Sequence, residues 1–151
     1  MSLAARLLVA GGVMSMAIGL LHVGVIVAGP PAYAFFGAGE KMTALARGGS
    51  PMPALITAVL VGVFIVFGLY ALSGAGAIRR LLLLRTGLLA IGGVYTLRGL
   101  SVIPQATLLA TRPELFPLRY VLFSAAALVV GLCYLGGTVG RWKALSTSVA
   151  T

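Results

Sequence analysis

The chain has 151 residues, of which 60% are hydrophobic and 9% are charged, and its mean hydropathy is +1.12. This composition excludes an ordinary soluble domain and is typical of a polytopic membrane protein, so we expect one membrane domain over residues 1–151. The formal charge of +9 comes from basic residues scattered around the ends of apolar segments. That distribution favours contact with membrane lipids and excludes nucleic acid as a partner, because no basic face with a nucleic-acid motif is present.

The first predicted membrane span covers residues 7–28, which are apolar apart from Ser15 and His22. As a helix it is about 33 Å long, enough to cross a bilayer. A cleaved secretory signal is the competing interpretation, because a small-x-small site follows at residues 32–34, but the apolar run exceeds the hydrophobic region of a typical signal. Glycine, serine and His22 share one helical face, so we expect His22 to point toward the other helices.

Residues 29–52 form a long connection between the first two spans. Gly29, Pro30 and Pro31 end the first helix, and the aromatic residues that follow suit a membrane interface. We predict a short interfacial helix or a long loop here, and this segment carries Glu40.

Three further apolar segments complete the predicted fold. The spans cover about residues 53–72, 81–103 and 118–139; Pro104 ends the third, and residues 104–117 form a second long connection that carries Glu114. Six basic residues lie on the side of both termini and four on the other. The sequence therefore predicts an all-α integral membrane protein, an antiparallel four-helix bundle, with cytoplasmic termini in a bacterial inner membrane.

The third span contains Arg98, a charge at membrane depth that needs a partner. In the predicted topology Arg98 and His22 lie at similar depth, about 7.5 and 9 Å from the outer ends of their helices. Tyr95, Ser101 and Gln105 share a helical face with Arg98. These five residues define a candidate ligand-binding pocket in the outer half of the bundle.

Two interpretations of Arg98 remain open. In one, its side chain reaches toward the lipid phosphates or pairs with a loop glutamate and stabilises the fold. In the other, its guanidinium recognises the phosphate or carboxylate of an amphipathic ligand. For His22 the alternatives are a hydrogen bond in helix packing and a role in catalysis.

Three functions follow from these alternatives. The first is binding of a lipid-like or amphipathic, anionic ligand around Arg98 and His22. The second is an accessory or scaffold subunit of a larger membrane complex, or a homo-oligomer. The third is a small membrane enzyme acting on a lipid-like substrate, in which His22 with Glu40 or Glu114 supplies the acid and base, so whether the protein is an enzyme stays open.

Other site classes are excluded by counts. The single cysteine, Cys133, rules out an internal disulfide, and the single histidine rules out a bis-histidine haem. No phosphate loop, zinc motif or nucleophile elbow is present, so we predict neither a metal site nor a cofactor.

Overall fold

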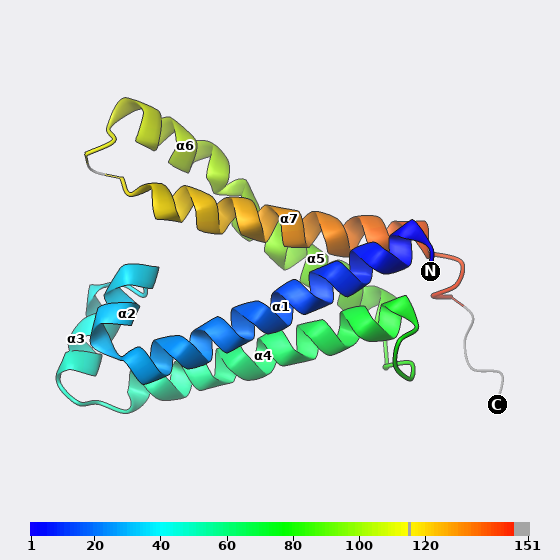
Figure 1. Ribbon diagram of the computed structural model, residues 1–151, viewed down its shortest axis with the longest axis horizontal. Coiled ribbons are helices and arrows are strands. Elements are labelled where there is room, and N and C mark those ends of the chain that lie inside the picture. The colour runs from blue at the N-terminus through cyan, green and yellow to red at the C-terminus, as the bar shows by residue number, and fades with distance from the viewer. Residues whose placement is uncertain (115, 147–151) are drawn as a thin grey trace. The chain divides into compact units, whose positions relative to one another are not determined.

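The computed structural model describes residues 1–114 and 116–146, and this part of the chain is helical without a β-strand. The final residues of the predicted membrane domain, 147–151, and Leu115 in the second connection lie outside the described residues. The helices, labelled in Figure 1, are α1 (Leu3–Ala28), α2 (Pro30–Phe36), α3 (Glu40–Arg47), α4 (Met52–Ala75), α5 (Leu84–Leu100), α6 (Val102–Thr111) and α7 (Leu118–Gly140). The all-α class is confirmed.

Four helical segments are long and apolar enough to cross a membrane. They are Leu3–Ala28, Met52–Ala75, Leu84–Thr111 and Leu118–Gly140. The prediction of four spans in an integral membrane protein is confirmed to that extent. The antiparallel four-helix bundle, the bacterial inner membrane and the cytoplasmic termini stay predictions.

The third span differs from its predicted bounds at both ends. Its helix begins at Leu84, and beyond Leu100 it continues as α6 after an interruption at Ser101, so that much of the predicted 104–117 connection is helical. Pro104 lies in the first turn of α6, where the missing N–H would have no intrahelical partner in any case. A proline there marks a new helix start, not the end of the span.

The connection between the first two spans contains two short helices, α2 and α3, which pack against each other. Gly29 (φ 70°), Gly37 (φ 77°) and Gly39 (φ 90°) adopt left-handed or related conformations at the turns. Only glycine adopts these conformations without strain, so these glycines determine where the chain turns. The sequence left open whether this connection is a short helix or a long loop, and the structure has two short helices joined by turns.

The chain divides into two compact units. Unit 1 comprises Met1–Val13 and Leu69–Thr151, and unit 2 comprises Met14–Gly68. The core of unit 1 is the antiparallel pair α5 and α7, in which glycines allow close contact. A Cβ atom on Gly99 would lie 2.5 Å from Cα of Leu128, and one on Gly131 would lie 2.4 Å from Oγ1 of Thr96.

The first turns of α1 complete unit 1. Leu8 is fully buried against Gly137, and a Cβ atom on Gly140 would lie 2.7 Å from Cβ of Ala4. At the same end of unit 1, Arg80 donates hydrogen bonds to the carbonyls of Ala144 and Leu145. We call this end, where the 76–83 loop and residues 141–146 meet, the basic end; its cationic residues are Arg79, Arg80, Arg85, Arg141 and Lys143.

In unit 2, α1 and α4 run side by side (Figure 1). A Cβ atom on Gly19 would lie 3.2 Å from Cβ of Phe64, which explains the glycine at this crossing. Tyr33 of α2 and Thr43 of α3 are buried.

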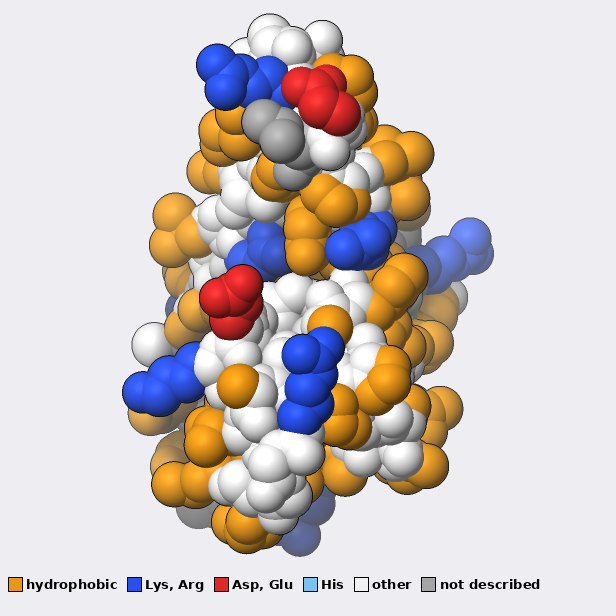
Figure 2. All heavy atoms as spheres, turned by 90° about the vertical axis from the view of Figure 1, so that its left-hand side faces the viewer, with side chains coloured by type: hydrophobic (Ala, Val, Ile, Leu, Met, Phe, Trp, Pro, Cys, Tyr) orange, Lys and Arg blue, Asp and Glu red, His pale blue; other side chains and the backbone are white. Residues whose placement is uncertain are grey.

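Many large hydrophobic side chains are exposed, and Figure 2 shows hydrophobic side chains on one face together with basic and acidic ones. Such exposed apolar surface on long helices is suited to contact with lipid acyl chains.

Candidate functional site

Arg98 lies in the last turn of α5, in unit 1. The carbonyl end of a helix carries a partial negative charge, so a cation is favourable at this position. The side chain of Arg98 is exposed, and its backbone is fixed by the close contact of the neighbouring Gly99 with α7. The guanidinium is therefore accessible although its Cα belongs to the most tightly packed helix pair of the unit.

A hydrogen-bonded relay orients this guanidinium. Nη1 of Arg98 donates to Oγ of Ser124 over 2.7 Å, and Oγ of Ser124 donates to Oε1 of Gln105 over 2.6 Å. Ser124 lies on α7 with 0% exposure, and Gln105 lies on α6. The relay thus joins α5, α7 and α6 through a buried hydroxyl group that accepts one hydrogen bond and donates another.

The relay leaves most of the guanidinium donors of Arg98 available. A guanidinium has five N–H groups, and one of them is engaged by Ser124. In the described part of unit 1 Arg98 forms no ion pair with Glu114, so the predicted pairing with that loop glutamate is not seen. An exposed, oriented guanidinium is suited to bidentate recognition of a phosphate or carboxylate.

Two of the predicted neighbours of Arg98 serve local structure. Oγ of Ser101 donates to the carbonyl of Arg98 over 2.7 Å, which satisfies a carbonyl at the end of α5. Tyr95 is buried and stacks on Tyr134 of α7 with 5.9 Å between ring centroids. Of the residues predicted on the face of Arg98, the relay therefore includes Gln105 but neither Ser101 nor Tyr95.

His22 lies in unit 2. Its Nδ1 is 2.7 Å from the carbonyl oxygen of Ile18, one turn earlier in α1, and its ring lies 4.9 Å from that of Phe64 on α4. Because a carbonyl oxygen only accepts, Nδ1 of His22 donates this hydrogen bond. These contacts favour the helix-packing role of His22.

The two glutamates lie apart from any evident catalytic group within their own units. Glu40 is the first residue of α3, where the helix dipole favours an anion. In the described part of unit 2 no hydrogen bond joins Glu40 to His22. Glu114 is exposed next to the undescribed Leu115, and in the described part of unit 1 it makes no ion pair with Arg98. Within each unit, the described residues therefore form no acid and base pair.

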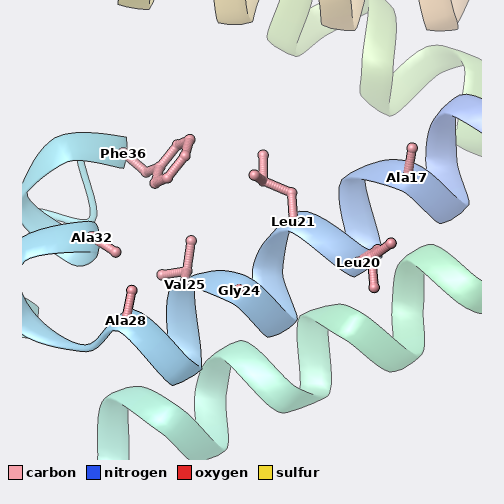
Figure 3. A pocket seen from close by; sticks show the side chains of 8 residues that line it. All are labelled: Ala17, Leu20, Leu21, Gly24, Val25, Ala28, Ala32 and Phe36. Atoms are coloured by element: carbon pink, nitrogen blue, oxygen red, sulfur yellow. The ribbon is translucent and has the colours of Figure 1, made fainter.

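An apolar groove of about 460 Å³ lies between α1 and α2 of unit 2 (Figure 3). Phe36 on α2 faces Leu21 and Val25 on α1 across the groove. The full lining consists of Ala17, Leu20, Leu21, Gly24, Val25, Ala28, Ala32 and Phe36. Because its lining carries no polar or charged side chain, the groove is suited to a hydrocarbon chain.

Ser124 is the functional candidate that sequence reasoning missed. The available signal was a hydroxyl residue within one apolar span and an arginine within another, since polar groups at membrane depth tend to pair with each other.

In the described residues Cys133 is a free thiol, and no group of three histidine, cysteine or acidic residues could hold a metal ion.

Comparison with protein-family models, with curated proteins and with solved structures found no match to this chain.

Proposed function

We propose that this integral membrane protein binds a lipid-like or amphipathic ligand whose anionic end meets Arg98. The observation that supports the proposal is the relay, because a buried serine and a glutamine hold an exposed guanidinium on helices long enough to span a membrane. A charge at membrane depth is costly, so an arrangement that orients it without an anionic partner in the described part of its own unit favours a partner from outside that unit. The ligand is a phosphate or carboxylate amphiphile.

The apolar groove of unit 2 supports the lipid-like character of the ligands. It has the dimensions of a site for part of an acyl chain and offers it no charged side chain. Membrane lipids are therefore the proposed partners, and a bacterial inner membrane with cytoplasmic termini is the proposed location.

Native mass spectrometry of the protein in mild detergent tests the proposal by comparing wild type with Arg98→Leu. We expect a small molecule of defined mass that is retained by wild type and lost in the variant. Arg112→Leu is the matched control, because Arg112 is an exposed arginine that follows α6 and takes no part in the relay. Equal retention by all three proteins would contradict the proposal.

The role of His22 is tested separately with His22→Phe, which keeps an aromatic ring against Phe64 but loses the bond to Ile18. If His22 acts only in packing, we expect the retained molecule to stay and the melting temperature to fall slightly. Loss of the molecule at unchanged stability would assign His22 to the ligand.

A scaffold subunit is the second candidate function. It is favoured by the exposed apolar face of α4, on which a Cβ atom at Gly62 would meet nothing within 4 Å. A glycine open to the outside of a membrane helix permits close approach of another helix. A stable oligomer without any retained small molecule in the same mass spectra would replace the ligand proposal with this one.

A further inference from the structure

Gln105 takes part in the relay with only one end of its side-chain amide. Its Oε1 accepts the hydrogen bond from Oγ of Ser124 over 2.6 Å. The other end of the amide, Nε2, carries two N–H groups. In the described part of unit 1 these N–H groups have no acceptor, and the side chain of Gln105 is half-buried on α6. The amide therefore has two donors to offer to a ligand.

The order of donors and acceptors in the relay determines which way this amide faces. The guanidinium of Arg98 only donates, so Oγ of Ser124 accepts from Nη1 over 2.7 Å. The single proton of the serine hydroxyl is then left for Gln105, and Oε1 is the amide atom that accepts it. Because Nε2 is bonded to the same carbon atom as Oε1, its N–H groups point away from Ser124.

The guanidinium and the amide flank the same buried hydroxyl group. They are separated from each other by the two hydrogen bonds of the relay. Ser124 has 0% exposure, whereas Arg98 is exposed and Gln105 is half-buried. Both donor groups are thus more accessible than the serine that orients them, and one oxyanion that approaches from the surface of unit 1 can contact both.

Anionic amphiphiles differ in the number of terminal oxygen atoms that they offer to such donors. A carboxylate has two, and a phosphodiester, the headgroup linkage of most membrane phospholipids, also has two. A guanidinium in a bidentate pair engages both of them, so neither is left for a separate donor. A phosphate monoester has three strong acceptor oxygens, and its third oxygen is available to Nε2 of Gln105.

We propose that Gln105 makes the Arg98 site select amphiphiles that end in a phosphate monoester over carboxylates and phosphodiesters. This inference rests on the proposed function, because it requires the anionic end of the ligand to meet Arg98, and it names the ligand class that this function leaves open. Selection against phosphodiesters has a clear use in a membrane, where the bulk phospholipids otherwise compete for an accessible guanidinium.

Isothermal titration calorimetry of the full chain in a maltoside detergent tests this selectivity with ligands of equal chain length. Dodecyl phosphate is the monoester, methyl dodecyl phosphate the phosphodiester and dodecanoate the carboxylate. The last two each carry one negative charge and two terminal oxygens at neutral pH, so we expect wild type to bind them alike. We expect dodecyl phosphate to bind at least about tenfold more tightly, because it gains one hydrogen bond between an amide and a charged oxygen.

A variant of Gln105 separates the third hydrogen bond from the greater charge of dodecyl phosphate. Gln105→Met keeps a side chain of similar length but removes the amide, so we expect the preference for dodecyl phosphate to fall about tenfold. A preference that came from charge alone would persist in this variant. Thr107→Val is the matched control on α6, because the hydroxyl of Thr107 donates to the carbonyl of Ile103 in its own helix. It is expected to keep the wild-type preference.

Arg98→Leu distinguishes a failure of this inference from a failure of the proposed function. If wild type binds the three ligands equally and Arg98→Leu binds none of them, the proposed function stands and the selectivity is overturned. The selectivity is also overturned if Gln105→Met keeps the full preference, or if Thr107→Val loses as much of it as Gln105→Met does. If wild type binds none of the ligands, or if Arg98→Leu binds dodecyl phosphate as tightly as wild type does, both proposals fail.

Discussion

The two ends of α5 hold their arginines in different ways. Arg98, in the last turn, is oriented by the side chains of Ser124 and Gln105. Arg85, about 20 Å away in the first turn, is oriented by the carbonyl and the ring of Trp142. Backbone carbonyls at a helix end remain after any side-chain substitution. The hydrogen bond from Arg98 to Ser124 is lost when that one serine is replaced. The Arg98 end is therefore more sensitive to single substitutions in its neighbours.

The largest effect is expected from Gly99→Ala, which separates α5 from α7 beside Arg98. Its new Cβ would lie 2.5 Å from backbone atoms of Leu128, which cannot rotate away. We expect a loss of about 3 kcal/mol in thermal unfolding in detergent, the upper range for overpacking. Gly93→Ala is the control, because its Cβ would meet nothing within 4 Å. Equal melting of the two variants would contradict the described contact.

Ser124→Ala breaks the relay while leaving the helix pair intact. The change removes the acceptor of Arg98 and leaves Oε1 of Gln105 without its donor. We expect a loss of about 1 to 3 kcal/mol, the usual cost of leaving a buried polar group unpaired. Ser101→Ala, whose hydroxyl bonds only within its own turn, should cost less. If both serines cost the same, the relay does not contribute specifically.

Arg85→Lys tests the basic end in the same way. A lysine keeps the charge but loses the planar group that lies over Trp142. We expect a loss of about 0.5 to 1 kcal/mol in unfolding free energy and a shift in the emission of Trp142. Arg79→Lys serves as the control and should leave the emission unchanged.

Leu83→Gly is expected to give the smallest effect, with the opposite sign. Relief of the strain at φ 51° favours the folded state by about 1 kcal/mol, reduced by the greater freedom of glycine in the unfolded chain. The melting temperature in detergent should rise slightly, whereas Leu82→Gly should not raise it. A lower melting temperature for Leu83→Gly would show that this leucine stabilises the fold by contacts.

The sequence predicted the four apolar spans because their length and composition alone decide them. It did not predict that Pro104 lies within a helix, because a proline is compatible both with the end of one helix and with the first turn of the next. The helical spacing placed Arg98 and Gln105 on one face, whereas the contact with Ser124 required the register between α5 and α7. That register depends on the contacts of Gly99 and Gly131, which no single-helix pattern contains.

Because the helix is interrupted at Ser101, the orientation of Arg98 depends on the tilt of α6. Because Pro104 has no N–H, the carbonyl of Leu100 lacks its usual partner, and the junction between α5 and α6 bends more easily than a continuous helix. Gln105 is carried by α6, so a tilt of α6 stretches its bond to Ser124 and frees that hydroxyl to rotate. The direction of the guanidinium is thus mechanically coupled to a helix to which Arg98 does not belong.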